Sequence, residues 1–139
     1  YDAGTHAVMA DVQNMRLGMS ICYDVRFAAL YRDYAQTGAE IMAVPAAFTR
    51  PTGRDHWATL LRARAIETGA FVVAPAQGGE HDDGRATWGH SLVVNPWGEI
   101  IAEIDNDDPG YVIADLDPQL VIEARRKIPA WQNNAAYTL

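Results

Sequence analysis

The chain has 139 residues, 49% of them hydrophobic, which is enough for the core of one ordinary domain and excludes a disordered segment. Its net charge of −7, with no basic run longer than residues 125–127, argues against nucleic acid and anionic membranes as partners. No apolar run approaches the length of a membrane span, and a single cysteine cannot form an internal disulfide, so we expect a reducing, cytoplasmic compartment.

Two strands and a helix are expected at the start of the chain. Residues 5–12 have an extended pattern, residues 13–16 suit a hairpin turn, and the apolar run that follows ends at Cys22. Residues 27–37 place apolar side chains at helical spacing, with Gly38 as a stop signal. This helix would lie on one face of the sheet. Because the chain opens at Tyr1 without a methionine, we expect it to be the later part of something longer.

The middle of the chain predicts a second crossover. Residues 40–45 form a short apolar run after a helix, which favours a parallel strand and a right-handed connection. Residues 46–55 are expected to form a loop at the same edge as Cys22, where folds of this kind build substrate sites. Residues 56–68 predict the clearest helix, with Asp55 as its N-cap.

The rest of the chain predicts further strands and one more helix. In chain order these are a buried strand at residues 71–77, a polar loop at 80–85, a hairpin of strands at 92–95 and 99–104, a strand at 111–116, and a helix at 118–127. Residues 129–139 suit an extended tail. The prediction is therefore one α/β unit spanning residues 1–139.

Cys22 stands between an apolar run and a helical pattern. N–H groups at the start of a helix would point toward its side chain, where they can stabilise a thiolate and bind a developing oxyanion. The alternative is a buried, inert cysteine. We favour a functional cysteine because a structural strand end would not need the polar residues Tyr23, Asp24 and Arg26. Asp24 and Arg26 are close enough to pair with each other or with neighbouring loops, and so to support the turn that carries Cys22.

Other reactive side chains favour structural roles. His56 or His90 could in principle form a papain-like pair with the cysteine, but one begins a helix and the other lies beside a glycine and a tryptophan. Glu67 follows the cysteine on a helix and is expected to pair with Arg62 or Arg64. One cysteine and four scattered histidines offer no short-spaced ligand pairs, so no metal and no cofactor is expected.

Several segments resemble one known family in the same order. Residues 22–27, Cys-Tyr-Asp-Val-Arg-Phe, resemble the nucleophile motif of the nitrilase (carbon–nitrogen hydrolase) superfamily, and the likeness continues through residues 44–49, 56–69 and 89–99. Altogether it covers about residues 1–128. The Gly-His-Ser and Asn-Pro-Trp-Gly segments are most similar to the branch holding ω-amidase and deaminated-glutathione amidase.

The resemblance implies a fold and a chemistry. The fold would be the C-terminal half of an αββα sandwich, with a mixed sheet and helices on one face. Cys22 would attack the carbonyl carbon of a small amide and form an acyl-enzyme, with the Tyr23 backbone N–H holding the oxyanion. The residues Ala46, Ala47 and Phe48 would line the substrate pocket. The family's glutamate and lysine lie upstream of the cysteine, and none of the 21 residues before Cys22 is Glu or Lys, so the chain alone is expected to be inactive.

Two other functions stay open from the sequence. The first is a non-catalytic binding or assembly module that retains the fold. The second is a redox-responsive thiol protein, which only Cys22 supports. A Glu and a Lys encoded upstream of Tyr1 would favour the amidase over the module. By analogy with the family, a homodimer or larger homo-oligomer is expected.

Overall fold

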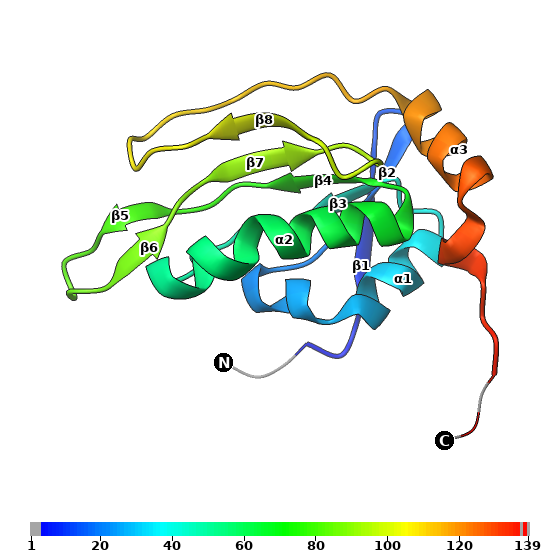
Figure 1. Ribbon diagram of the computed structural model, residues 1–139, viewed down its shortest axis with the longest axis horizontal. Coiled ribbons are helices and arrows are strands. Elements are labelled where there is room, and N and C mark those ends of the chain that lie inside the picture. The colour runs from blue at the N-terminus through cyan, green and yellow to red at the C-terminus, as the bar shows by residue number, and fades with distance from the viewer. Residues whose placement is uncertain (1–3, 137, 139) are drawn as a thin grey trace.

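The computed structural model describes residues 4–136 and residue 138. A six-stranded sheet in the order β1-β2-β3-β4-β7-β8 forms its centre (Figure 1). Its strands are β1 (Val8–Val12), β2 (Met15–Met19), β3 (Ile41–Ala43), β4 (Phe71–Ala74), β7 (Ser91–Val94) and β8 (Ile100–Ile104). The helices are α1 (Ala28–Gln36), α2 (Arg50–Thr68), α3 (Pro118–Lys127) and the 3-10 helices η1 (Cys22–Arg26) and η2 (Pro129–Gln132). Among the described residues, no helix is both long and apolar enough to cross a membrane.

The middle of the sheet is parallel and its two sides are antiparallel. Strands β2, β3 and β4 run parallel, because α1 and α2 carry the chain back to the same end between them. The pairs β1–β2, β4–β7 and β7–β8 are antiparallel. This arrangement confirms the expected mixed sheet, and it brings the carboxyl ends of β2, β3 and β4 to one edge.

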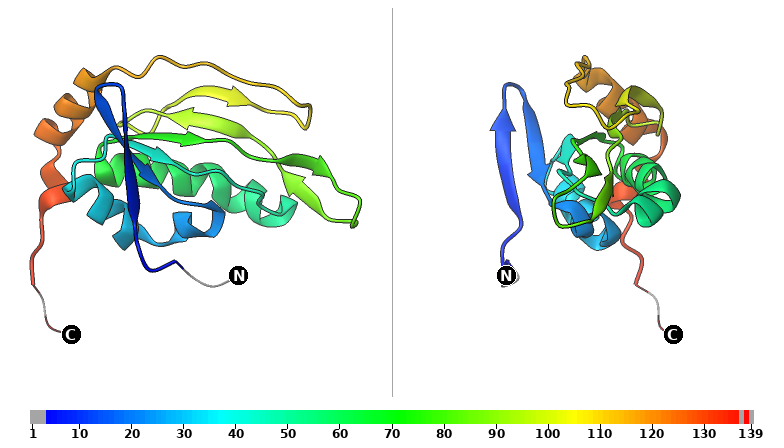
Figure 2. Two further views of the ribbon diagram at one scale, coloured as in Figure 1. Left: turned by 180° about the vertical axis from the view of Figure 1, so that it is seen from behind. Right: turned by 90° about the vertical axis from the view of Figure 1, so that its left-hand side faces the viewer.

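Helices α1 and α2 lie against one face of the sheet, as Figures 1 and 2 show from different sides. Alternate strand residues such as Met42 and Val72 point toward them and are fully buried. Tyr31 of α1 and Trp57 of α2 fill the space between the layers. The main core therefore arises where one face of the apolar strands meets the apolar stripe of each helix, and the sequence predicts both the apolar runs and the stripe of α2.

Helix α3 packs against strand residues of the opposite parity. Ile41 and Phe71 form a second, smaller cluster with Val121 of α3. Arg125 of the same helix donates hydrogen bonds to the carbonyls of Thr68 and Ala39, at 3.0 and 2.6 Å. Burial lowers the pKa of this guanidinium from its usual value. Helix α3 thus ties together the chain segments that follow α1 and α2.

Helix α2 begins at Arg50, six residues before the expected start, so the expected loop at residues 46–55 ends early. Thr49, not Asp55, is the N-cap residue, and Pro51 lies in the first turn, where its missing N–H costs nothing. Gly53 donates from its N–H to the Thr49 carbonyl at 2.7 Å and continues the helix. The proline and glycine that suggested a loop are instead features of a helix start.

Two further expectations were wrong in detail. Strand β4 ends at Ala74 rather than at residue 77, and the residues around the expected polar loop form an extra hairpin of β5 (Gly78–Glu80) and β6 (Ala86–Trp88), with that loop at its tip. The expected strand at residues 111–116 has alternating exposure, but no described strand pairs with it. Alternation of exposure needs only an extended chain beside the sheet, whereas a strand also needs a hydrogen-bonded neighbour.

Candidate functional site

Cys22 lies at a sharp turn between β2 and α1. Strand β2 ends at Met19, and Cys22 begins the 3-10 helix η1 rather than ending a strand. The Cys22 N–H donates to the Pro45 carbonyl at 2.8 Å, which ties the turn to the end of β3. The φ angle of Cys22 is +48°, in the left-handed region that costs a non-glycine residue about 1–2 kcal/mol. A strained, partly exposed cysteine is a feature that function, rather than stability, would maintain.

The turn is fixed by Asp24. Its carboxylate accepts a hydrogen bond from the Ile21 N–H at 2.9 Å, while its own N–H donates to the Ile21 carbonyl at 3.0 Å. These reciprocal bonds enclose Cys22 and Tyr23. The Tyr23 N–H has no hydrogen-bond partner within the part of the chain that the structure describes. It is therefore available to a ligand beside Cys22.

Arg26 takes part in a different set of contacts. Its guanidinium lies over the rings of Tyr23 and Phe48, at 5.4 and 5.2 Å from their centroids, and donates toward His56 Nδ1 at 3.3 Å. Asp24 and Arg26 thus hold separate parts of the turn and its neighbourhood, and the structure does not bring these two side chains together as an ion pair.

Arg64 of α2 contacts the η1 turn from the buried side. It is almost completely buried, and its Nε donates to the Val25 carbonyl of η1 at 2.8 Å. Its Nη1 pairs with Glu67 at 2.6 Å, which confirms one of the two expected partners of that carboxylate. Its guanidinium also lies 5.6 Å from the ring centroid of Tyr31. A long helix thus fixes η1 through one charged side chain.

A second buried contact lies behind the turn. Ser20 Oγ and the Tyr31 hydroxyl are 2.6 Å apart, and Ser20 Oγ also donates to the Ala43 carbonyl at 2.8 Å. Burial raises the pKa of Tyr31 to about 12, because the interior disfavours a phenolate. The strand that leads to Cys22 is therefore bonded to both α1 and β3.

A hollow of about 580 Å³ opens in front of Cys22. It lies where the parallel strands end, the edge at which α/β folds commonly bind ligands. Ala46 and Ala47 line it together with Cys22, whereas Phe48 does not. The Phe48 ring is buried against Trp57, with centroids 4.9 Å apart, because the chain turns inward to begin α2. Phe48 contacts the turn at Cys22 through the Arg26 guanidinium, which lies over its ring.

Sequence reasoning did not single out several other lining residues. Pro75, Ala76 and Ser91 also line the hollow, and Ser91 Oγ both accepts from the Ala76 N–H at 2.8 Å and donates to its carbonyl. The sequence held a signal for Pro75 and Ala76, which follow a buried parallel strand to this edge. Ser91 gave no such signal, because it begins β7 and reaches this edge through the antiparallel pairing of β7 with β4.

Neither of the two candidate histidines, His56 and His90, pairs with Cys22. His56 Nδ1 is engaged by Arg26, and His90 Nδ1 lies 3.2 Å from a carboxylate oxygen of Glu103. No hydrogen bond joins either ring to Cys22 within the described residues. In the same part of the chain, no three His, Cys, Asp or Glu side chains gather as a metal site. The arrangement offers a thiol, a free backbone N–H and a largely apolar hollow.

Comparisons with known proteins agree on one family. Residues 1–126 match the carbon-nitrogen hydrolase family. A deaminated glutathione amidase of Synechocystis sp. is 49% identical over 117 residues, which are 84% of this chain and 43% of that protein. The chain therefore spans less than half of the length of this relative.

Solved structures agree with this result. The crystal structure of the C. elegans NitFhit protein superimposes with a TM-score of 0.87 at 42% identity, covering 96% of this chain and 32% of that one. An amidase from Nesterenkonia sp., solved with acrylamide added to its active-site cysteine, has a TM-score of 0.74 at 27% identity, covering 93% of this chain and 50% of that one.

Proposed function

Because the chain belongs to the carbon–nitrogen hydrolase family of the nitrilase superfamily, in the branch of the deaminated glutathione amidases, we propose that it supplies the nucleophile of an amidase site. The observation that carries this proposal is the turn at Cys22. A strained cysteine, an unpartnered N–H one residue later and an apolar hollow lie together. They supply the nucleophile, the oxyanion donor and the substrate space for cleavage of an amide through a covalent cysteine intermediate, which also needs proton-transfer groups.

In the proposed reaction, Cys22 Sγ loses its proton to a base and forms a bond to the carbonyl carbon of a small amide. The carbonyl π bond breaks and leaves an oxyanion, which accepts a hydrogen bond from the Tyr23 N–H. Collapse of this intermediate breaks the C–N bond, and the nitrogen leaves as ammonia or an amine after taking up a proton. Water then attacks the thioester, releases the carboxylic acid and restores the thiol.

Asp24 and Arg26 act on the nucleophile without touching the substrate, whereas Ala46 and Ala47 line the substrate pocket. Asp24 fixes the η1 turn through the Ile21 N–H, and Arg26 fixes its outer side through Phe48 and His56. Ala46 and Ala47 line the pocket and exclude water from the carbonyl. Preorganisation of this kind costs stability and gains rate, because the donor is in place before charge develops.

The proton-transfer groups are proposed to come from outside this chain. No Glu or Lys precedes Cys22 here, and the family resemblance places both upstream of the nucleophile. The complete active site would therefore need the preceding part of a longer protein, and the 139 residues alone would be inactive. We also propose that the protein acts in the cytoplasm, where a free thiol stays reduced, and as a homodimer or larger homo-oligomer.

The test uses the protein that contains this chain together with the residues encoded before it. Release of ammonia from a small neutral amide such as butyramide is expected, and Cys22→Ala is expected to lower kcat at least about 1,000-fold. Arg126→Ala, on the exposed side of α3, is the matched control and should leave kcat unchanged.

Two results would decide against the amidase. A protein that binds amides but turns none over, with or without Cys22, would be a binding module. A protein that turns none over but whose Cys22 forms a reversible disulfide with glutathione at cytoplasmic redox potentials would be a thiol switch.

A further inference from the structure

The outer side of the turn at Cys22 is held by side-chain contacts. Tyr23 is exposed, and its ring lies 5.7 Å from the ring of Phe27 and 5.4 Å from the guanidinium carbon of Arg26. Arg26 is held in turn by α2, because its Nη1 donates to His56 Nδ1 at 3.3 Å. A single turn of 3-10 helix has poorer hydrogen-bond geometry than an α-helix, so the position of Tyr23 depends also on these contacts.

The contact between Arg26 and His56 defines the state of the histidine ring. A guanidinium has N–H donors and no acceptor, so a hydrogen bond from Arg26 needs a lone pair on His56 Nδ1. The ring is therefore neutral and carries its one proton on Nε2. In a protonated ring both nitrogens are donors, so two cations would face each other without a hydrogen bond.

The carboxylates around His56 are paired elsewhere. Asp55, its neighbour on α2, is paired with Arg54 at 2.9 Å, and the Asp24 carboxylate of η1 accepts from a backbone N–H of its own turn. Strand β6, which packs against this part of α2, carries no ionisable side chain. The elements that meet at His56 carry these ionisable side chains: Cys22, Tyr23, Asp24 and Arg26 on η1, and Arg54 and Asp55 beside it on α2. Among residues 4–136, a positive His56 would thus face Arg26 without an ion-pair partner of its own.

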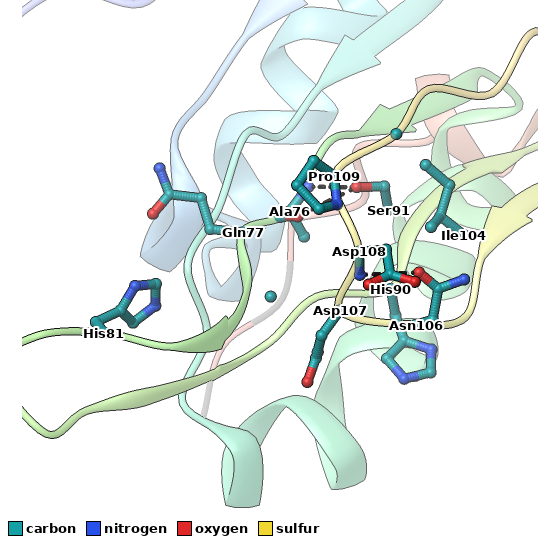
Figure 3. A pocket seen from close by; sticks show the side chains of 12 residues that line it. Ala76, Gln77, His81, His90, Ser91, Ile104, Asn106, Asp107, Asp108 and Pro109 are labelled. Carbon is teal, nitrogen blue, oxygen red and sulfur yellow. Dashed lines mark hydrogen bonds between the residues drawn. The ribbon is translucent and has the colours of Figure 1, made fainter.

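The histidines on the other side of the site have different partners. His81 and His90 line a second hollow beside the first, as Figure 3 shows. His81 Nε2 lies 2.8 Å from the Thr87 hydroxyl, and His90 Nδ1 lies 3.2 Å from a carboxylate oxygen of Glu103. A hydroxyl or a carboxylate can accept from a protonated ring, so neither contact is lost when the ring takes up a proton. At His56 the partner is itself a cation, and the contact is lost.

We propose that His56 is a positioning residue for the amidase reaction, because its neutral ring holds Arg26 against Tyr23 and so keeps the Tyr23 N–H directed at the developing oxyanion. Histidine is the side chain whose charge ordinarily changes between about pH 5 and pH 8. A proton taken up at Nδ1 breaks the bond from Arg26, releases the outer side of η1 and lowers the rate without changing any substrate contact. This role rests on the amidase function proposed above.

The test measures kcat and KM for butyramide in the complete protein between about pH 5 and pH 8. His56→Asn puts an amide oxygen, which accepts a hydrogen bond and does not titrate, in place of Nδ1. The ratio of kcat in the unchanged protein to kcat in His56→Asn removes the effect of the other titrating groups, which both proteins share. We expect similar kcat values at about pH 8 and a ratio that falls about 10-fold by about pH 5, as the oxyanion donor is displaced.

Two further variants separate the hydrogen bond from other effects. His56→Leu has no acceptor at any pH and is expected to lower kcat about 10-fold at about pH 8, with KM within about two-fold, since no substrate contact is lost. His6→Asn is the matched control, because His6 is exposed and its Nδ1 is bonded to the adjacent Thr5 hydroxyl at 2.8 Å. This variant should follow the pH profile of the unchanged protein.

The outcomes separate this proposal from the function on which it rests. If the unchanged protein hydrolyses butyramide but the ratio is the same at every pH, the positioning role is wrong and the amidase stands. Equal losses of kcat in His56→Asn and His56→Leu at about pH 8 would also overturn the role, because the acceptor would then not matter. If His56→Leu changes KM alone, His56 contacts the substrate instead. If the unchanged protein hydrolyses no amide, both proposals fall together.

Discussion

The two sides of the Cys22 hollow are built differently. The side that carries the cysteine is bonded to three elements, through Cys22 N–H to the end of β3, Ser20 to α1, and Arg64 to α2. The opposite side consists of residues 75–77, Ser91 and Gly110, and beyond it the β5–β6 hairpin and residues 104–109 carry exposed polar side chains and surface ion pairs. The reacting group is thus held by many contacts, whereas the opposite side consists of more exposed segments. A fold built in this way can keep its chemistry while its substrates vary.

Arg64 offers the largest test of the fixed side. Arg64→Leu leaves the buried Val25 carbonyl without its donor and removes the contact with Tyr31, so we expect the free energy of unfolding to fall by about 3 kcal/mol. Urea unfolding measures the change. Arg126→Leu, on the exposed side of α3, should cost much less, and equal losses for the two variants would show that Arg64 does not support η1.

A substitution at Gly53 tests how closely the β5–β6 hairpin must pack against α2. A Cβ at this position of α2 would lie 2.2 Å from Cβ of Trp88 in β6, so Gly53→Ala must push the hairpin away from the helix. We expect a loss of about 2 kcal/mol in the free energy of unfolding. Gly4→Ala is the control, since nothing lies within 4 Å of its added Cβ. If Gly53→Ala leaves the free energy of unfolding unchanged, the β5–β6 hairpin can move away from α2 without a cost in stability.

Tyr31 adds a pH dependence to the fixed side. Its folded pKa of about 12 lies above the usual value of 10.0, so the neutral phenol stabilises the fold below pH 10, and this contribution is lost as the pH rises from 10 through 12. Between pH 9 and 11 the protein should lose about 1.4 kcal/mol more than Tyr31→Phe, which has no group to titrate. If the free energy of unfolding falls equally with pH in both proteins, Tyr31 does not have a raised pKa in the folded state.

Cys22 itself gives the smallest expected effect. Because its φ angle is +48°, Cys22→Gly should be more stable than Cys22→Ala by about 1 kcal/mol, the reverse of the usual order of these residues. Thermal unfolding of the two variants measures the difference. An alanine variant as stable as the glycine variant would argue against a strained turn.

Extended apolar patterns predicted the fold better than local signals did. The continuous apolar runs of β3 and β4 and the helical stripe of α2 identified the core, because strands covered on both faces are apolar along their length and a helix is apolar along one stripe. Pro51 and Gly53 were misread as loop residues, since Pro is as common in the first turn of a helix as in a loop, and the glycine is required by Trp88, 35 positions later.

The site shows the same limit. The residues beside Cys22 in sequence were predicted to lie at the turn and do so, because local spacing determines their place. Ala46 and Ala47 reach the hollow because they follow a parallel strand to the same edge, whereas Phe48 turns inward. Gln77 reaches the hollow in the same way, because it follows β4 to this edge, whereas Ser91 joins the hollow only through the pairing of β4 with β7, and strand pairing between distant segments cannot be read from local spacing.

The contacts of Arg125 bear on the order in which a ribosome can complete this structure. The carbonyls that it binds, at Ala39 and Thr68, come 86 and 57 positions earlier in the chain. A nascent chain that has already formed both crossover helices would still expose those two acceptors until α3 leaves the exit tunnel. Final closure during biosynthesis therefore waits for one late cationic side chain, and a polypeptide truncated just before it would be a natural substrate for chaperones.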